Sequence, residues 1–444
     1  MREGSLDAPT RHPVDWQNPD FTDPEKLDAE MRRQLDVCHG CRRCFNLCDS
    51  FPRLFDLIDE SESEELDTVD SKDFAPVVEA CTLCDMCFLT KCPYVPPHEF
   101  ALDIPHLMLR YRYAEHKAGN TALAHKQLAQ TDRNGKLAGM VAPIANWGAN
   151  VGNTLTRPVM EKVGGIDRQA SLPRFNGKTL TARAKKMDHV ANSAAPAASI
   201  GGRKAAIFAT CYTNYNLPEA GEAAIKLLNH LGVETRVDYP GCCGMPYLEH
   251  GNIEKVVAQA EMVAAALLPL VDEGYDIVAP TASCALMLKF EWPLLAPDNA
   301  DLKKLAEATF DVCEYVVDIA KKEGLPEGLN TVDGGVTVHH ACHARAQNMG
   351  AKSAEMLRLI PKTKVALVER CSGHGGTFGV LKETHAVAVK IARPTVRQIK
   401  KAESGAVVSD CPLAANHLHA MMRDEGITSP ARHPIEIMAQ AYGL

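Results

Sequence analysis

The chain has 444 residues, a formal net charge of -8 and sixteen cysteines. This length allows about three domains, and the cysteine content is too low for a small secreted scaffold stapled by disulfides. The N-terminus lacks the apolar segment of a signal peptide, and no uninterrupted apolar run reaches the ~18 residues that cross a bilayer. No clustered basic face indicates a nucleic-acid partner. We therefore expect a cytoplasmic protein with reduced thiols, with peripheral attachment at the inner membrane as the alternative.

Two tight cysteine runs near the N-terminus predict iron–sulfur clusters. Three cysteines spaced three residues apart ligate one 4Fe-4S cube. In two-cluster ferredoxins, the fourth Cys of each run ligates the other cube. Zinc and disulfides are the alternatives, but a zinc knuckle needs one Cys fewer. The second run has four residues before its last Cys, where ferredoxins have three. The first cube would use Cys38, Cys41, Cys44 and Cys92, and the second would use Cys81, Cys84, Cys87 and Cys48.

The segments between and after these runs differ in composition. Residues 51–80 carry ten acidic side chains and are interpreted as a solvated connection between the two cysteine runs, with docking of a basic redox partner as the alternative. Residues 111–188 look helical and irregular, with basic side chains followed by an apolar, glycine-rich stretch at 137–151. Contact with a membrane surface or a partner subunit and packing between domains both remain open for that stretch. Residues 190–202 have the Ala, Ser, Gly and Pro content of a flexible linker.

Beyond residue 202, short β-branched runs alternate with amphipathic helices. Strands are predicted at 205–209, 233–239 and 276–279, and again at 336–339, 364–368 and 406–408. This alternation favours parallel sheets, whose ligands sit at the carboxyl ends of the strands. The predicted fold is α/β, with an N-terminal α-helical ferredoxin domain followed by two repeated α/β lobes. The expected segments are a tail (1–30), the ferredoxin domain with two 4Fe-4S clusters (31–110), a helical connection and linker (111–202), a first lobe (203–330) and a second lobe (331–444).

Each predicted strand of the two lobes leads to a cysteine. The distances from Cys211 to Cys342, from Cys242 to Cys371 and from Cys284 to Cys411 are 131, 129 and 127 residues, which indicates a repeat. The first lobe has four candidate iron ligands, Cys211, Cys242, Cys243 and Cys284. Neighbouring thiolates on a glycine-flanked turn can bind different metal atoms, although a packed structural pair is the alternative.

The second lobe has only three of these cysteines, Cys342, Cys371 and Cys411, with Ser372 in the place of the second vicinal Cys. A metal there would need a further ligand, either external or from His343, His374 or Asp410. An open coordination position is also what a catalytic iron requires. Cys313, between the lobes, has no partner motif and is interpreted as a structural thiol.

The glycines after residue 372 do not form a dinucleotide-binding loop. Phe378 stands where the third Gly of GxGxxG is required. Since no flavin or nicotinamide fingerprint is found, electrons must enter from another subunit or directly from a substrate.

Together, the paired ferredoxin motifs, the linker and the duplicated Cys-Cys-Gly repeat resemble one family of iron–sulfur subunits. Its members include the iron–sulfur C subunit of anaerobic glycerol-3-phosphate dehydrogenase, the D subunit of heterodisulfide reductase, lactate- and glycolate-oxidising subunits, and iron–sulfur oxidoreductases associated with rubrerythrin. The resemblance implies two 4Fe-4S clusters, one or two further clusters in the CCG-type lobes, and the lobe cysteines above as their ligands. The five-cysteine heterodisulfide reductase lobe ends in CxxC, whereas here Thr281 and Ala414 replace the outer cysteines.

The resulting functional hypothesis is an electron-transfer subunit of an oxidoreductase complex. It would carry electrons from a flavoprotein dehydrogenase to quinone or another acceptor, since the clusters supply the redox chemistry. The chain would not be catalytic alone. The alternative is a reductase that acts directly on a disulfide or a peroxide-linked substrate at the second lobe, and a redox sensor is a third interpretation.

Overall fold

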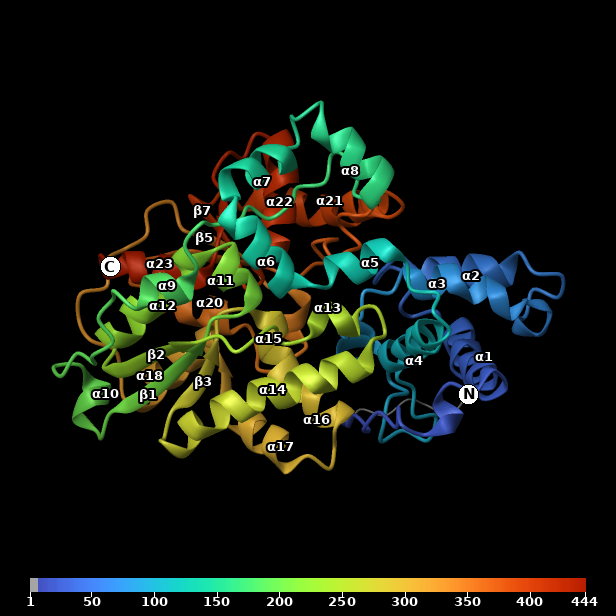
Figure 1. Ribbon diagram of the computed structural model, residues 1–444, viewed down its shortest axis with the longest axis horizontal. Coiled ribbons are helices and arrows are strands. Elements are labelled where there is room, and N and C mark those ends of the chain that lie inside the picture. The colour runs from blue at the N-terminus through green and yellow to red at the C-terminus, as the bar shows by residue number, and fades with distance from the viewer. Residues whose placement is uncertain (1–6) are drawn as a thin grey trace.

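The computed structural model describes residues 7–444, apart from the side chain of Lys91. A helical region near the N-terminus lies at one end of the molecule, and two α/β lobes form the rest (Figure 1). The first six residues of the predicted tail lie outside the described residues. Within residues 7–444, no helix combines the length and the apolar character needed to cross a membrane.

The cysteine-rich region is helical, as predicted. Helix α1 begins at Pro24 because the Asp23 carboxylate accepts a hydrogen bond from Lys26 N, and it ends where Arg42 adopts a left-handed conformation. Leu27, Met31 and Leu35 recur every four residues and are buried. The elements of this region are η1 (Pro19–Phe21), α1 (Pro24–Cys41), α2 (Ser50–Asp59), η2 (Leu66–Thr68), η3 (Ser71–Phe74), α3 (Ala75–Glu79), η4 (Cys87–Lys91) and α4 (Ile104–Lys117).

The segment ahead of α1 packs onto the rest of the molecule. Arg11 pairs at 2.8 Å with Asp85 and Asp103, and at 3.3 Å with Glu291. Val14 is buried nearby. Glu291 belongs to the first lobe, so Arg11 connects this lobe to the cysteine-rich region.

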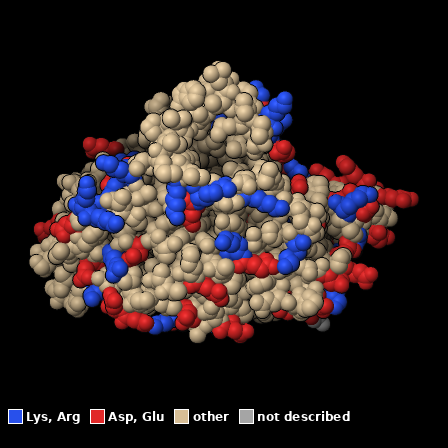
Figure 2. Space-filling model, viewed as in Figure 1, with Lys and Arg blue, Asp and Glu red and all other residues tan. Residues whose placement is uncertain are grey.

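Six short helices connect this region to the first lobe. The apolar side chains of α6, α7 and α8 are exposed rather than packed between domains; Met140 is 75% exposed, Ile144 68% and Trp147 59%. These helices project from the body as a largely uncharged surface (Figure 2). The six helices are α5 (Leu123–Leu128), α6 (Thr131–Met140), α7 (Ala142–Ala149), α8 (Thr156–Gly164), α9 (Leu180–Ala184) and α10 (Pro196–Ser199).

Part of the segment with linker composition is packed. Ala195 and Ala197 are buried, and Asn192 N donates a hydrogen bond to Asn229 O at the end of α12 (Pro218–His230). Small side chains therefore serve close packing here, because the chain passes tightly against a helix end.

The first lobe is a four-stranded parallel sheet in the order β2-β1-β3-β4. Its strands are β1 (Arg203–Phe208), β2 (Val233–Asp238), β3 (Asp276–Ala279) and β4 (Thr309–Asp311). Its helices besides α12 are α11 (Cys211–Tyr215), α13 (Met245–Leu248), α14 (Ile253–Asp272), α15 (Ala282–Leu286), η5 (Met287–Glu291), α16 (Trp292–Leu295), α17 (Ala300–Glu307) and α18 (Val312–Lys322).

The second lobe repeats this topology in the order β6-β5-β7-β8, also fully parallel. Its strands are β5 (Val336–His339), β6 (Val365–Val368), β7 (Ala406–Ser409) and β8 (Ala431–Arg432), and its helices are α19 (Cys342–Arg345), α20 (Lys352–Leu357), α21 (His385–Ala402), α22 (Pro412–Asp424) and α23 (Pro434–Ala441). The predicted parallel sheets and their repeat are thus confirmed. The short fourth strands, β4 and β8, were not predicted.

The two lobes share one hydrophobic core. Ile225 and Leu228 of α12 and Val316 of α18 belong to the same buried cluster as Met356 of α20 and Met438 of α23. This common core holds the carboxyl edges of the two sheets in a defined relation, which places the cysteines that follow the strands.

Candidate metal centres

Four cysteines of the N-terminal region line one small cavity. Cys38 and Cys41 lie in the last turn of α1, Cys44 follows in the loop, and Cys92 comes from the second run. Burial raises the pKa of the Cys38 thiol well above its usual range, and the neighbouring Cys92, Cys44 and Cys41 raise it further. Such a group of buried thiols becomes thiolate only if a cation compensates the charge.

The extra residue before Cys92 is accommodated by a π-turn. In η4, Cys92 N donates to Cys87 O at 3.1 Å, a hydrogen bond that spans five residues. The departure from ferredoxin spacing therefore does not remove Cys92 from the first group of cysteines.

A second group comprises Cys48, Cys81, Cys84 and Cys87. Burial raises the pKa of Cys48 to about 12, and the neighbouring Cys81 raises it further. The pKa of Cys87 is raised by burial and then by Cys84, Cys81 and Cys48. Cys48, the last Cys of the first run, thus lies with the second run.

The loop that carries the second run has an unusual backbone held by charged side chains. Leu83 and Asp85 have φ values of 47° and 62°, a left-handed conformation that costs free energy in a non-glycine residue. Asp85 is retained by its ion pair with Arg11. Arg112 of α4 donates hydrogen bonds to the carbonyl oxygens of Val78 and Cys81. These charged side chains were not predicted as parts of the site, since no motif links them to the cysteines.

The four cysteines of the first lobe meet at the carboxyl edge of its sheet. The Sγ atoms of Cys243 and Cys284 are 3.2 Å apart, and those of Cys242 and Cys211 are 3.8 Å apart. Hydrogen bonds from Cys211 and Cys243 lower the pKa of Cys242. Gly244, with a φ of 89°, provides the turn that presents both vicinal thiols to the same site.

Two further side chains support this loop. The Asp132 carboxylate of α6 accepts a hydrogen bond from Cys242 N at 3.0 Å, and the indole nitrogen of Trp292 donates to Cys243 O at 3.0 Å. Neither residue was predicted, because each comes from a distant part of the chain. Asp132 links the helical connection directly to the cysteines of the first lobe.

In the second lobe, three cysteines follow the corresponding strands. Burial raises the pKa of Cys342, and Cys371 and Cys411 contribute next. Gly373 N donates to the Cys371 sulfur at 3.3 Å. The Ser372 hydroxyl accepts a hydrogen bond from His374 N at 3.4 Å. The lobe therefore assembles three thiols and one hydroxyl at the edge where the first lobe has four thiols.

The candidate additional ligands of the second lobe differ in their hydrogen bonding. His343 Nδ1 lies 2.8 Å from Ser283 Oγ, and Asp410 pairs with His340 at 2.9 Å. Nε2 of His374 is buried and has no hydrogen-bond partner among the described residues. Of the three side chains, His374 thus retains a nitrogen available to a ligand.

The cysteine groups adjoin one another in series. Cys92 N of the first group donates a hydrogen bond to Cys87 O of the second group at 3.1 Å. Leu83 O, beside Cys84, lies 3.4 Å from Nε2 of His343, which follows Cys342 of the second lobe. Nδ1 of the same imidazole lies 2.8 Å from the hydroxyl of Ser283, which precedes Cys284 of the first lobe. The series therefore runs from the N-terminal region through the second lobe to the first.

Cys313 stands apart from this series. It is 1% exposed within the core shared by the lobes, and its backbone nitrogen donates to the Asp311 carboxylate at the start of α18. None of the sixteen cysteines, all within the described residues, forms a disulfide.

The four-thiol groups match the donor set of an iron–sulfur cluster. Within residues 7–444, no trio of Cys, His, Asp or Glu side chains is close enough to hold one metal ion. An iron–sulfur cube instead spreads its four thiolates over separate iron atoms.

The glycine-rich segment after β6 serves close packing. At Gly376, which has a φ of +57°, a Cβ atom would lie 1.9 Å from the Glu249 carboxylate, and at Gly375 it would lie 2.4 Å from Thr82. Only glycine allows the second lobe to approach both the first lobe and the cysteine-rich region so closely.

Comparison with known proteins agrees with this architecture. The cysteine-rich (CCG) domain model matches residues 205–289 and 336–419, one stretch in each lobe. The C subunit of the anaerobic glycerol-3-phosphate dehydrogenase of Escherichia coli is 26% identical over 332 residues, which cover 74% of this chain and 79% of the relative. Lactate utilization protein A of Geobacillus kaustophilus is 31% identical over 48% of this chain and 89% of its own length.

A third relative is the B subunit of the CoM/CoB fumarate reductase of Methanothermobacter marburgensis, 26% identical over 64% of this chain and 55% of the relative. The matched stretches of the CCG model contain all seven candidate cysteines of the lobes and all or most of each strand that precedes them. The chain belongs to the CCG cysteine-rich-domain family of iron–sulfur oxidoreductase subunits.

Proposed function

We propose that this protein is an iron–sulfur electron-transfer subunit that carries electrons between a flavoprotein dehydrogenase and quinone or another acceptor. The observation that carries the proposal is the series of adjoining cysteine-bearing segments, which links three parts of the molecule. Two relatives are named for dehydrogenase or reductase subunits, which supports assembly with a catalytic partner. The five segments expected from the sequence are retained as the domain organisation in this proposal.

The proposed ligand sets follow the groups described above. Cys38, Cys41, Cys44 and Cys92 would hold one 4Fe-4S cluster, and Cys81, Cys84, Cys87 and Cys48 the other. The four cysteines of the first lobe would hold a further cluster, and Cys342, Cys371 and Cys411 would hold a fourth where the second lobe binds metal. When bound, such clusters supply one-electron redox chemistry.

The chain itself positions and insulates these groups. Cys87, Cys243 and Cys284 are buried. Arg112 donates a hydrogen bond to the carbonyl oxygen of Cys81, and Arg11 pairs with the side chain of Asp85 in the same loop. The Gly373 amide donates to the Cys371 sulfur, and hydrogen bonds to cluster sulfurs are one means by which a protein sets a reduction potential.

A peripheral position at the inner membrane is part of the proposal, with the exposed apolar side chains of α6–α8 as the contacting surface. The remaining part of the chain would face the cytoplasm. Apolar side chains grouped on a projecting surface are typical of membrane or partner contact.

One observation favours the alternative function, a reductase that acts directly on a disulfide or peroxide-linked substrate. The second lobe has one thiol fewer than the first, and His374 keeps a buried nitrogen without a hydrogen-bond partner among residues 7–444. An incompletely ligated centre has a position at which a substrate can bind.

An activity assay of the isolated chain distinguishes the two functions. Anaerobically reconstituted protein should accept electrons from dithionite or a reduced flavoprotein and pass them to a quinone or a dye. It should not oxidise glycerol 3-phosphate, lactate or glycolate unaided. Steady turnover of these substrates, or reduction of a disulfide by reduced dye without flavin, would replace the carrier function with the catalytic one.

A further inference from the structure

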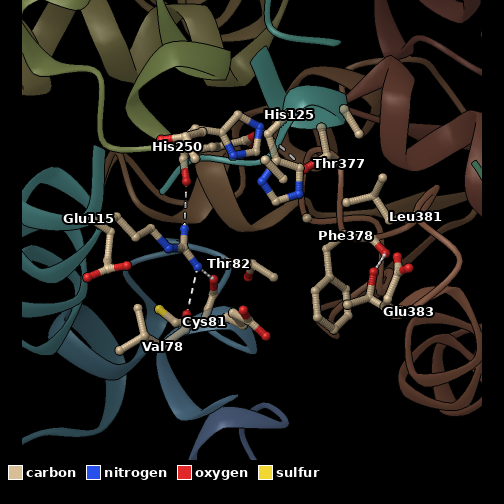
Figure 3. A pocket seen from close by; sticks show the side chains of 18 of the residues that line it. Val78, Cys81, Thr82, Glu115, His125, His250, Thr377, Phe378, Leu381 and Glu383 are labelled. Carbon is tan, nitrogen blue, oxygen red and sulfur yellow. Dashed lines mark hydrogen bonds between the residues drawn. The ribbon is translucent and has the colours of Figure 1, made fainter. Parts of the chain in front are cut away.

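A cavity of about 430 Å³ borders the second cysteine group. One wall comes from the cysteine-rich region, with Val78, Cys81 and Thr82 (Figure 3). The facing wall comes from the second lobe and includes Thr377 and Phe378. His125 of α5 and His250, which follows α13, lie between these walls. A ligand in the cavity would therefore lie directly beside a proposed cluster ligand, Cys81.

The charges around the cavity disfavour an anionic ligand. Four glutamates line it: Glu79, Glu115, Glu249 and Glu383. Arg112 is the only Lys or Arg among the described lining residues, and its two terminal nitrogens donate to the carbonyl oxygens of Val78, Cys81 and Glu249. A nucleotide or another phosphate-bearing ligand would meet an excess of acidic side chains in this lining. A neutral ligand fits it.

The cavity also offers uncharged hydrogen-bonding groups. The rings of His125 and His250 stack with centroids 4.2 Å apart. Burial lowers the pKa of both imidazoles, that of His250 to about 3, so both are neutral at pH 7. Burial raises the pKa of Glu249 to about 7, so part of its population carries a proton. Neutral imidazoles and a protonated carboxyl are donors for the carbonyl oxygens of an uncharged ligand.

Apolar side chains line the cavity, among them Val78, Phe378 and Leu381. In the sequence, the exposed Leu123 stands between the lining residues Ala122 and Ala124, and the exposed Val163 stands two residues before the lining residue Gly165. They belong to the same helical connection as the uncharged projection in Figure 2. A ligand with a lipophilic substituent would be favoured by contact with the apolar lining side chains.

We propose that this cavity binds a para-quinone, which accepts the electrons carried by the chain. The proposal rests on the proposed function and specifies its acceptor site. Reduction adds two electrons and two protons to the quinone, converting its two C=O groups to C–OH. The cluster that Cys81 would help to hold would supply these electrons one at a time, and a reduced flavoprotein would be their source. Glu249 supplies one proton and regains it from solvent, and solvent supplies the other.

The first test measures binding rather than turnover. Oxidised, cluster-loaded protein is dialysed to equilibrium against menadione, a soluble naphthoquinone. Ala122→Trp, which places a large ring at an exposed position of the lining, should weaken binding at least tenfold. Ala118→Trp is the matched control, because Ala118 is exposed, lies at the end of α4 and is not a lining residue. Equal binding by both variants would overturn the proposal, as would saturable binding of flavin mononucleotide that Ala122→Trp abolishes.

The second test examines Glu249. Glu249→Gln should keep menadione binding within about threefold while lowering kcat for quinone reduction at least tenfold relative to reduction of ferricyanide, which takes up no proton. An unchanged ratio of the two rates would remove Glu249 as proton donor. Failure of the proposed function has a different signature, since the clusters would then remain oxidised with the reduced flavoprotein whichever acceptor is present. If menadione still binds although the flavoprotein does not reduce the clusters, the cavity is a quinone site that receives no electrons. That result would overturn its assignment as the acceptor site.

Discussion

The hydroxyl of Ser283 lies 2.8 Å from Nδ1 of His343, so the two lobes are hydrogen-bonded directly beside their cysteines. Ser283 precedes Cys284, and His343 follows Cys342. A second contact nearby runs from the Gln347 side chain to Ala282 O at 3.3 Å. The cysteine edges of the two sheets therefore face each other.

Removing the Ser283 hydroxyl should loosen this contact. In Ser283→Ala, His343 Nδ1 loses its partner in a largely buried position, at a cost of about 1 kcal/mol. We expect a lower thermal midpoint in anaerobic calorimetry. Ser199→Ala is the control, because its hydroxyl bonds only locally to Pro196 O on an exposed helix. Equal midpoints for the two variants would show that the contact does not stabilise the junction between the lobes.

The crossed arrangement of the N-terminal cysteines predicts which cluster each variant affects. Cys48→Ser should alter the cluster at Cys81, Cys84 and Cys87, while Cys92→Ser should alter the one at Cys38, Cys41 and Cys44. A serine hydroxyl is a poorer iron ligand than a thiolate. EPR spectra of the reduced variants distinguish the two clusters. If Cys48→Ser changes only the cluster of the first run, the crossed assignment is wrong.

The two lobes should respond unequally to loss of the residue at the second vicinal position. Cys243→Ser should lower the iron content, because Cys243 lies 3.2 Å from the Cys284 sulfur in the four-thiol site. Ser372→Ala should leave the iron content unchanged. Cys313→Ala is the control for the loss of a buried thiol outside the cysteine series. Iron and sulfide analysis after anaerobic purification gives the result, and iron loss in the Ser372 variant would contradict it.

His106 should make the stability of the fold depend on pH. Burial and Arg11 disfavour its charged form, but Asp103 and Glu291 outweigh them and raise its pKa to about 9. The imidazole binds its proton more tightly in the folded state than in the unfolded state, where its pKa is about 6.5. The resulting contribution to the free energy of unfolding is therefore complete below pH ~6.5. It is lost as the pH rises through about 9.

The corresponding measurement compares thermal midpoints of the wild type and His106→Gln between pH 6 and pH 10. The difference should be largest at the acidic end and shrink toward pH 10. Groups that titrate identically in both proteins cancel in this comparison. A difference that is constant across the range would show that His106 does not carry its charge in the folded protein.

Local sequence patterns were sufficient for most of the fold. The strands that precede Cys211, Cys284 and Cys342 were placed within two residues of their observed bounds, because β-branched runs beside helical periodicity are strong signals. Strands β4 and β8 have only three and two residues, too few for a periodic pattern. Composition indicated a flexible linker, but Ala195 and Ala197 of this segment are buried. Small side chains are common both in flexible linkers and in closely packed segments, so composition alone does not distinguish the two.

The cysteine spacing and the 127- to 131-residue repeat determined the family, the parallel sheets and the candidate ligands, because each depends on residues that are near in sequence or repeated in order. Only the tertiary structure decided that His343, beside Cys342, contacts Leu83, beside Cys84. It also decided that Asp132 accepts a hydrogen bond from the Cys242 amide and that Gly376 packs against the Glu249 carboxylate. These pairs join surfaces of different segments more than a hundred residues apart. Their proximity follows from how the helical region and the lobes pack, and no spacing along the chain records it.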